Sequence, residues 1–137
     1  MIDLIELIQC YITFALFGLI WTIQLVHYPA FHYIDLKKFT EFEKMHMVKI
    51  TYIVGPLMLG EFVVSLTLLF LTAFALKSII VFIIVILLWL STLLFSIPCH
   101  KKLANEKNDG EIQKLISTNW ARTILWSLKV LIVSFVS

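Results

Sequence analysis

Three ionisable side chains within or beside long apolar segments are the residues of this sequence best suited to chemistry. His27 follows one apolar run, His100 follows another, and Glu61 interrupts a third. Imidazole nitrogens and carboxylates are common metal ligands in proteins. Two arrangements are open: His27 and His100 bind a haem from two helices, or both histidines and Glu61 hold a mononuclear non-haem metal. A haem or a non-haem metal is therefore the cofactor to look for.

The last apolar segment carries a polar stripe. Its members recur at spacings of three and four residues, which places them on one helix face; they are Asn119, Arg122, Trp126 and Lys129. A charge at the middle of a bilayer costs about 2.5–3.5 kcal/mol. We therefore expect Glu61 to face the interior and to pair with Arg122 or Lys129. Lys129 has the alternative of extending to the outer surface.

Together these residues predict a polar site towards one end of the molecule. We expect His27, Glu61 and Arg122 to act in catalysis or proton movement. The residues expected to bind a cofactor or to orient an oxygen anion are His27, His100, Asn119, Trp120 and Lys129, and the expected metal ligands are His27, His100 and Glu61. A buried ion pair that only fixes the register of the helices is the alternative interpretation of the charges.

The composition indicates which elements position these residues. The chain has 137 residues, of which 61% are hydrophobic and 15% charged, against about 45–50% and about 25% in soluble domains. Its mean hydropathy is +0.97. Four segments have the roughly 20 apolar residues that a membrane-spanning helix needs, at about 4–28, 51–76, 78–98 and 118–137. The sequence predicts an all-α integral membrane four-helix bundle in the lipid bilayer, a single domain over residues 1–137, with no nucleic-acid signature.

The segment between the first two spans has its own helical pattern. Leu36, Phe39, Phe42 (or Glu43) and His46 recur at spacings of three and four with lysines mostly on the other faces, which predicts a short amphipathic helix on the membrane surface. Prolines fall near the same end of three spans, at Pro29, Pro56 and Pro98. They either open the bundle locally or simply end the helices, because proline removes a backbone donor.

The basic residues predict the orientation of the chain. Nine lie in the two long connections at one end of the predicted bundle, and one, Lys77, lies in the short connection at the other end. Loops rich in Lys and Arg stay in the cytoplasm. We expect a multi-pass protein of the inner (plasma) membrane with both termini outside the cytoplasm.

Four sequence blocks resemble segments of small uncharacterised bacterial four-helix membrane proteins. They are H-Y-P-A-F (27–31), G-P-L-M-L-G-E (55–61), I-P-C-H-K-K-L (97–103) and N-W-A-R-T-I-L-W-S (119–127). The general layout is similar to that of the anthrone-oxygenase-like membrane domains, whose last span carries an Asn/Trp/Arg cluster. The resemblance implies an oxidoreductase but no particular cofactor, and the positions that match are His27, Glu61, His100, Asn119 and Arg122.

Two functions are consistent with these patterns. The first is an oxidoreductase or oxygenase that acts on a hydrophobic small molecule such as a quinone, a polyketide or a porphyrin. The second is a non-catalytic membrane carrier or an accessory subunit of a membrane complex. The outer segments 7–17 and 63–76 are mostly apolar, which favours a closed pocket over a pore. Self-association into a homo-oligomer stays open.

Overall fold

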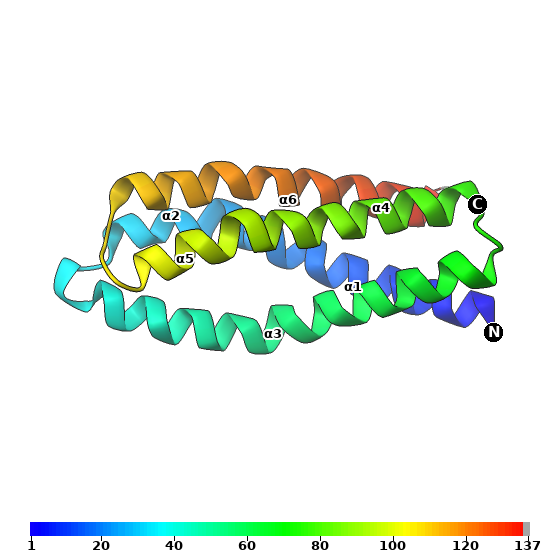
Figure 1. Ribbon diagram of the computed structural model, residues 1–137, viewed down its shortest axis with the longest axis horizontal. Helices are drawn as coiled ribbons and strands as arrows, with labels where there is room; N and C mark the ends of the chain where they lie inside the picture. The colour runs from blue at the N-terminus through cyan, green and yellow to red at the C-terminus, as the bar shows by residue number, and fades with distance from the viewer. Residues whose placement is uncertain (136–137) are drawn as a thin grey trace.

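Four helical rods lie side by side and make up the whole molecule (Figure 1). The computed structural model describes residues 1–135. The rods are α1 (Ile2–Thr22) with η1 (Ile23–His27), α2 (Tyr28–Ala30) and η2 (Phe31–Tyr33); α3 (Leu36–Leu71); α4 (Leu76–Ser91) with η3 (Thr92–Ser96) and α5 (Ile97–Leu103); and α6 (Asp109–Phe135). Both α1 and α4 pack against α3 and α6, so the rods form a ring around a shared interior. The predicted all-α, four-helix fold is confirmed.

Three of the rods are long and apolar enough to cross a membrane: Ile2–Tyr33, Leu36–Leu71 and Leu76–Leu103. The fourth rod, α6, carries the polar stripe and is not among them, so its role as a span stays a prediction. The 36 residues of α3 extend over about 54 Å, against about 30 Å for the hydrocarbon core of a bilayer. The bundle is therefore long enough to reach well beyond a membrane.

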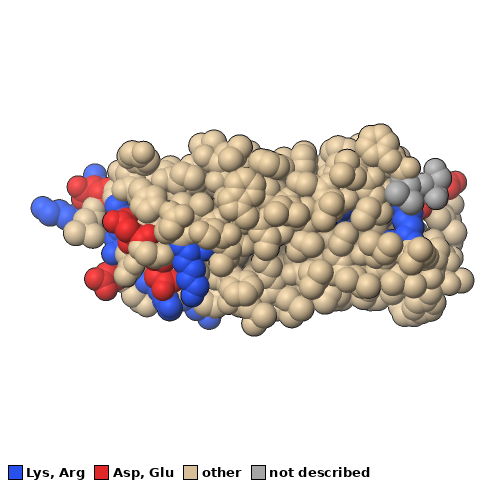
Figure 2. Space-filling view, turned by 90° about the horizontal axis from the view of Figure 1, so that it is seen from above, with Lys and Arg blue, Asp and Glu red and all other residues tan. Residues whose placement is uncertain are grey.

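Most charged side chains gather at one end of the molecule, a long uncharged surface follows, and a few charged side chains lie at the other end (Figure 2). At the charged end the two connections are tied together, because Lys107 donates to the carbonyls of His32 and Ile34 at 2.9 and 2.8 Å. Lys102 donates to Glu111 at 2.9 Å and thereby lowers the pKa of that carboxyl. The N-terminus and the C-terminal part of α6 lie at the opposite end (Figure 1).

Two prolines are accommodated by π-helical turns. A proline ring clashes with the carbonyl four residues earlier, which is that of Leu25 for Pro29 and that of Leu94 for Pro98. Both carbonyls belong to a π turn, η1 or η3, and the helix continues beyond each proline as α2 or α5. Pro29 and Pro98 therefore do not end their helices.

The predicted separate surface helix is wrong, because Leu36–Leu71 forms one continuous helix that contains Pro56. Asp35 caps its start by accepting a hydrogen bond from the Lys37 amide at 2.8 Å. The other rods also extend to the charged end, so the apolar face of this segment covers a protein core there instead of lipid. That core includes Phe31, Phe39, Cys99, Leu103, Ile112 and Leu115.

Candidate functional site

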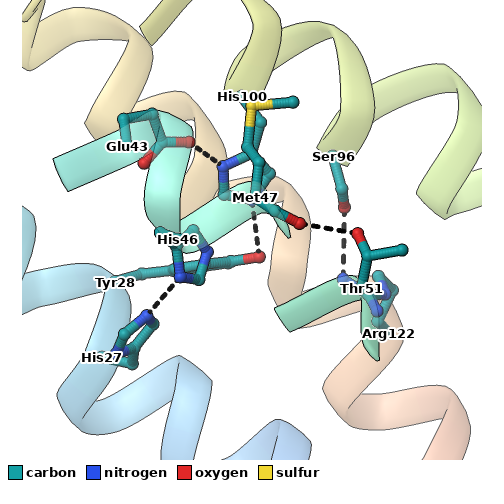
Figure 3. Close-up of polar contacts among 9 residues, drawn as sticks. All are labelled: His27, Tyr28, Glu43, His46, Met47, Thr51, Ser96, His100 and Arg122. Atoms are coloured by element: carbon teal, nitrogen blue, oxygen red, sulfur yellow. Dashed lines mark hydrogen bonds and ion pairs between the residues drawn. The ribbon is translucent and has the colours of Figure 1, made fainter. Parts of the chain in front are cut away.

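Three buried polar side chains near the charged end are linked by hydrogen bonds: Glu43 of α3, His100 of α5 and Tyr28 of α2 (Figure 3). Glu43 Oε1 lies 2.5 Å from His100 Nδ1, and His100 Nε2 lies 3.1 Å from the Tyr28 hydroxyl. Glu43 is fully buried and His100 is 8% exposed. These two contacts engage both ring nitrogens of His100 and hold its imidazole in one orientation.

A second pair of histidines lies against this chain. His27 Nε2 lies 3.0 Å from His46 Nδ1, and the rings of His46 and His100 pack with centroids 5.2 Å apart. His46 Nε2 and Glu43 Oε2 are buried and have no hydrogen-bond partner among residues 1–135. Buried polar atoms are seldom left without a partner, so these two atoms mark a place where a ligand fits.

Glu43, His46 and His100 each offer one ligand atom, and these atoms all lie within 4.8 Å of one another. Two imidazoles and one carboxylate are the donor set of mononuclear non-haem iron sites. The second nitrogens of the histidines already have partners, His27 on His46 and Tyr28 on His100. Metal-binding histidines usually have such a partner, which fixes the tautomer and the ring orientation. The donor set and its supporting contacts fit a single metal ion.

Local helix geometry brings these residues together. Glu43 and His46 are three residues apart on α3, so they share the face that points into the bundle. His27 and Tyr28 stand where η1 meets α2, and His100 lies four residues after the end of η3. A π turn changes the helical register of the residues that follow it, and such turns are frequent at functional sites. Each of the two rods that contain a π turn thus places a histidine in the site. His27 is the last residue of η1, and His100 lies in α5, which follows η3.

A cavity of about 330 Å³ adjoins the histidines, between α3 and the rod α4–η3–α5. Tyr28 and His100 form part of its wall, and Arg122 of α6 lies in the same wall. Met47 and Thr51 of α3 also line it, and Thr51 stands on the side of Ser96 and Arg122 in Figure 3. The remaining lining is mostly apolar and includes Ile23, Ile50, Val54, Met58, Trp89 and Ile97.

A second hollow of about 290 Å³ lies on the other side of the cluster, between the first rod and α3. Its polar lining residues are Thr22, His27, His46 and Lys49. The histidine cluster therefore separates two hollows, with His100 facing one and His27 and His46 facing the other.

Arg122 is a buried cation held without a carboxylate. Its Nη1 donates to Ser96 Oγ at 3.3 Å and to Asn119 Oδ1 at 3.2 Å, and its guanidinium lies 5.2 Å from the centre of the Trp126 ring. Asn119 in turn donates to Gln24 Oε1 at 2.8 Å. No ion pair among residues 1–135 includes Arg122, and its Nε has no partner there. The positive charge is thus available to a molecule in the cavity.

The predicted interior position of Glu61 is confirmed, and its partner is Lys129. Lys129 Nζ lies 2.6 Å from Glu61 Oε1, and both side chains are fully buried. The Trp126 indole donates to the two oxygens of the same carboxylate at 3.1 and 3.2 Å. Because Glu43 and Glu61 are 18 positions apart on the continuous helix α3, they are separated by about 27 Å along it. The structure therefore does not bring Glu61 to His27 and His100.

The other expected site residues divide between the interior and the surface. Asn119 is buried beside Arg122, whereas Trp120 is 40% exposed and packs edge-on against Trp21 with ring centroids 5.8 Å apart. Lys129 lies with Glu61 and does not line the cavity. Trp89 is the tryptophan that does line it.

Sequence reasoning missed Glu43 and His46 as candidate ligands. Both fell in the segment expected to lie as a separate helix on the membrane surface, outside the predicted four-helix bundle. The available signal was E-x-x-H over residues 43–46, a spacing that metal-binding helical bundles use to aim a carboxylate and an imidazole at one centre.

Comparison with known proteins adds no relative: no protein-family model, curated protein or solved structure matches this chain. The resemblance to the anthrone-oxygenase-like domains stays an expectation. The function has to be argued from the geometry of the site.

Proposed function

We propose that this protein is a membrane-bound oxidoreductase of the oxygenase kind, with a mononuclear non-haem metal held by Glu43, His46 and His100 and a hydrophobic small molecule as substrate. The observation that carries the proposal is the approach of three ligand atoms to within 4.8 Å of one another beside a cavity that shares His100. A metal held by these three residues would supply the chemistry that binds and activates dioxygen or a substrate oxygen.

The packing of the histidines favours a non-haem centre over a haem. The His46 ring contacts the His27 and His100 rings, with centroids 4.7 and 5.2 Å apart. Phe31 also packs against all three imidazoles. A porphyrin bound between His27 and His100 would have to displace both His46 and Phe31, whereas a single ion needs only a small movement of its three ligands.

The surrounding residues have supporting roles in this proposal. His27 and Tyr28 orient the two metal-binding imidazoles through their second nitrogens. Arg122 lies in the cavity wall and stabilises negative charge that develops on a substrate oxygen, since a fixed cation in a dry site is effective there. Asn119 and Ser96 hold the guanidinium in place.

We further propose that the lysine-rich end faces the cytoplasm and that the protein lies in the inner membrane with both termini outside, following the positive-inside rule. The residues that line the cavity include the exposed Thr51 and Ile97, which belong to two of the apolar rods. A hydrophobic substrate therefore reaches the cavity from the lipid.

Metal content is the direct test. The protein, purified in mild detergent and reconstituted anaerobically with Fe(II), Mn(II), Cu(II) or Zn(II) in turn, is analysed by inductively coupled plasma mass spectrometry. We expect one equivalent of a metal in the wild type and its loss in Glu43→Gln and His100→Ala. His32→Ala is the matched control, because His32 contacts Asp109 at the exposed end.

Two results would overturn the metal centre. One is a wild-type protein that retains none of the four metals after reconstitution. The other is equal retention in Glu43→Gln, His100→Ala and His32→Ala, which would place the metal elsewhere.

A non-catalytic carrier is the second candidate function. It is favoured by buried polar residues in the part of the bundle farther from the charged end than the histidines. Gln9 donates to Ser65 at 3.1 Å, and both are buried in segments expected to be apolar. A carrier would move solute or protons across proteoliposomes without added metal, at a rate that Glu61→Gln changes. If metal and flux are both absent, the proposal of an accessory subunit gains weight.

A further inference from the structure

The second hollow, of about 290 Å³ between the first rod and α3, lies at the surface of the molecule. Its lining includes the exposed residues Thr22 and Ile53 as well as the buried residues Ile23 and His46. On α3 the lining runs from Phe42 to Ile53, which are about 16 Å apart along the helix. The second hollow is therefore elongated along the bundle, and molecules around the protein can reach it.

Lys49 is the cation of the second hollow. Among the lining residues, all of which belong to the described part of the chain, it is the one lysine or arginine, and none is a carboxylate. Lys49 is exposed, and no ion pair among residues 1–135 includes it. Beyond it, the rest of α3 carries one charged residue, Glu61. Lys49 thus marks the boundary between the charged end of α3 and its apolar length.

The surroundings of the second hollow favour a lipid chain as its occupant. Both of its walls belong to rods that are long and apolar enough to cross a membrane. In a membrane, an unfilled hollow would deprive its lining of the dispersion contacts that partner atoms provide, so neighbouring lipid chains fill it. A transmembrane helix is about 10–12 Å across, which is too wide for a hollow of this length and volume, whereas one acyl chain is narrow and flexible.

We propose that the second hollow binds one anionic phospholipid, with an acyl chain between the first rod and α3 and the phosphate beside the Lys49 ammonium. Side chains of a helix tilt towards its N-terminus, which for α3 is the charged end. The Lys49 stem is therefore directed towards the level of the headgroups, and lysine stems lie along apolar surface while the ammonium reaches polar groups. The assignment rests on the membrane location in the proposed function and not on the metal centre.

The experiment measures lipid binding to the full chain by native mass spectrometry after titration in mild detergent. The two probes are dioleoyl phosphatidylglycerol and dioleoyl phosphatidylcholine, which share the acyl chains and the phosphate and differ in net charge. We expect one phosphatidylglycerol to bind about fivefold more tightly than phosphatidylcholine, the effect of one lysine on an anionic lipid. Equal affinities for the two lipids would overturn the inference.

Lys49→Gln tests the headgroup contact. The variant should lose the preference for phosphatidylglycerol and leave the affinity for phosphatidylcholine nearly unchanged. Lys44→Gln is the matched control, because Lys44 is an exposed lysine of the same helix that does not line the second hollow. Lys44→Gln should keep the preference, and an equal loss in both variants would show only a general attraction of the basic end for anionic lipid and would overturn the inference.

Thr22→Phe tests the position of the acyl chain. Thr22 lines the second hollow, and Thr67 lines neither of the two hollows. Each hydroxyl donates to the carbonyl four residues earlier, at 3.0 and 2.8 Å, so Thr67→Phe is a control that loses the same kind of hydrogen bond. Thr22→Phe should weaken the binding of both lipids severalfold, and equal binding by the two variants would overturn the inference.

The same spectra report a second copy of the chain as the alternative occupant. A wild-type dimer that retains no lipid and that Thr22→Phe dissociates would assign the second hollow to that copy and overturn the inference.

The lipid site and the proposed function fail separately. Selectivity that depends on Lys49 in a protein that takes up no metal would support the lipid site and remove the metal centre. Metal retention through Glu43 and His100 without a preference between the lipids would keep the metal centre and overturn the lipid site. Carbonate extraction of cell membranes tests the location itself: a protein released into the soluble fraction would remove both the membrane location and the lipid site.

Discussion

Two polar layers lie inside this bundle, and they differ in how completely their atoms are paired. The ion-pair layer consists of Glu61, Trp126 and Lys129, and both carboxylate oxygens of Glu61 have protein partners. The histidine layer consists of His27, Glu43, His46 and His100, and it leaves Glu43 Oε2 and His46 Nε2 without partners among residues 1–135. Two hollows adjoin the histidine layer.

How completely the polar atoms of each layer are paired indicates whether the layer stabilises the fold or binds a ligand. A buried charge pair whose charged groups both have protein partners holds helices in register without a further ligand, whereas a network with unpaired buried atoms is unfavourable unless something completes it. The ion-pair layer is therefore interpreted as structural, and the histidine layer as a site. A charge within an apolar segment did not by itself distinguish the two layers, although it directed attention to Glu61 first.

The largest expected effect comes from breaking the ion-pair layer. Lys129→Met leaves the Glu61 carboxylate buried without its cation and should lower the free energy of unfolding by about 3–5 kcal/mol. Replacing both partners, Glu61→Gln with Lys129→Met, should recover most of that loss. Denaturant titration in mild detergent measures it. A single variant as stable as the wild type would show that the pair has no structural role.

The next effect is specific to the histidine layer. A metal at 100 times its dissociation constant should raise the free energy of unfolding of the wild type by about 2.7 kcal/mol. Glu43→Gln should abolish this gain, because the amide is a much poorer metal ligand than the carboxylate. The Lys129→Met variant should keep it. Thermal unfolding with and without metal provides the measurement, and an equal gain in Glu43→Gln would exclude Glu43 as a ligand.

Two tryptophans test how much a paired polar group contributes to stability, because the indole N–H of one has a hydrogen-bond partner and that of the other does not. Trp126 donates to Glu61, whereas Trp89 Nε1 has no partner in the described chain. Both substitutions to Phe lose the same ring, but only the first loses a hydrogen bond to a charged group. Trp126→Phe should therefore cost about 1.5–3 kcal/mol more than Trp89→Phe. Similar unfolding midpoints for the two variants would show that the hydrogen bond from Trp126 to Glu61 contributes little to stability.

The smallest effect concerns a residue that supports a ligand. His27→Ala keeps all three proposed ligands and removes the partner of His46 Nδ1. It should weaken metal affinity about 10–100-fold without eliminating binding. Metal titration by isothermal calorimetry, with His32→Ala as the control, gives the ratio. Unchanged affinity in His27→Ala would mean that His46 needs no orienting partner.

Much of the helical architecture could be predicted because it depends on local properties. Apolar length predicted the rods, and helical periodicity predicted that Asn119, Arg122 and Glu61 are buried. The cost of two separated charges at similar depth predicted a cationic partner for Glu61, either Arg122 or Lys129, and the structure shows that the partner is Lys129. The prediction of a separate surface helix was wrong because helical periodicity shows only that one face is apolar. Such a face can cover either lipid or protein, and periodicity does not distinguish them.

The identity of the carboxylate beside the histidines was decided by tertiary structure. Glu43 meets His100 because α3 continues unbroken past the apolar segment and because the π turns let both kinked rods extend alongside it. The axial positions of packed helices depend on contacts between residues far apart in sequence, such as Tyr28 with His100. The sequence by itself determined which faces are polar, through helix period and the cost of exposing charge to lipid. Only the packing of the four rods determined which polar groups meet.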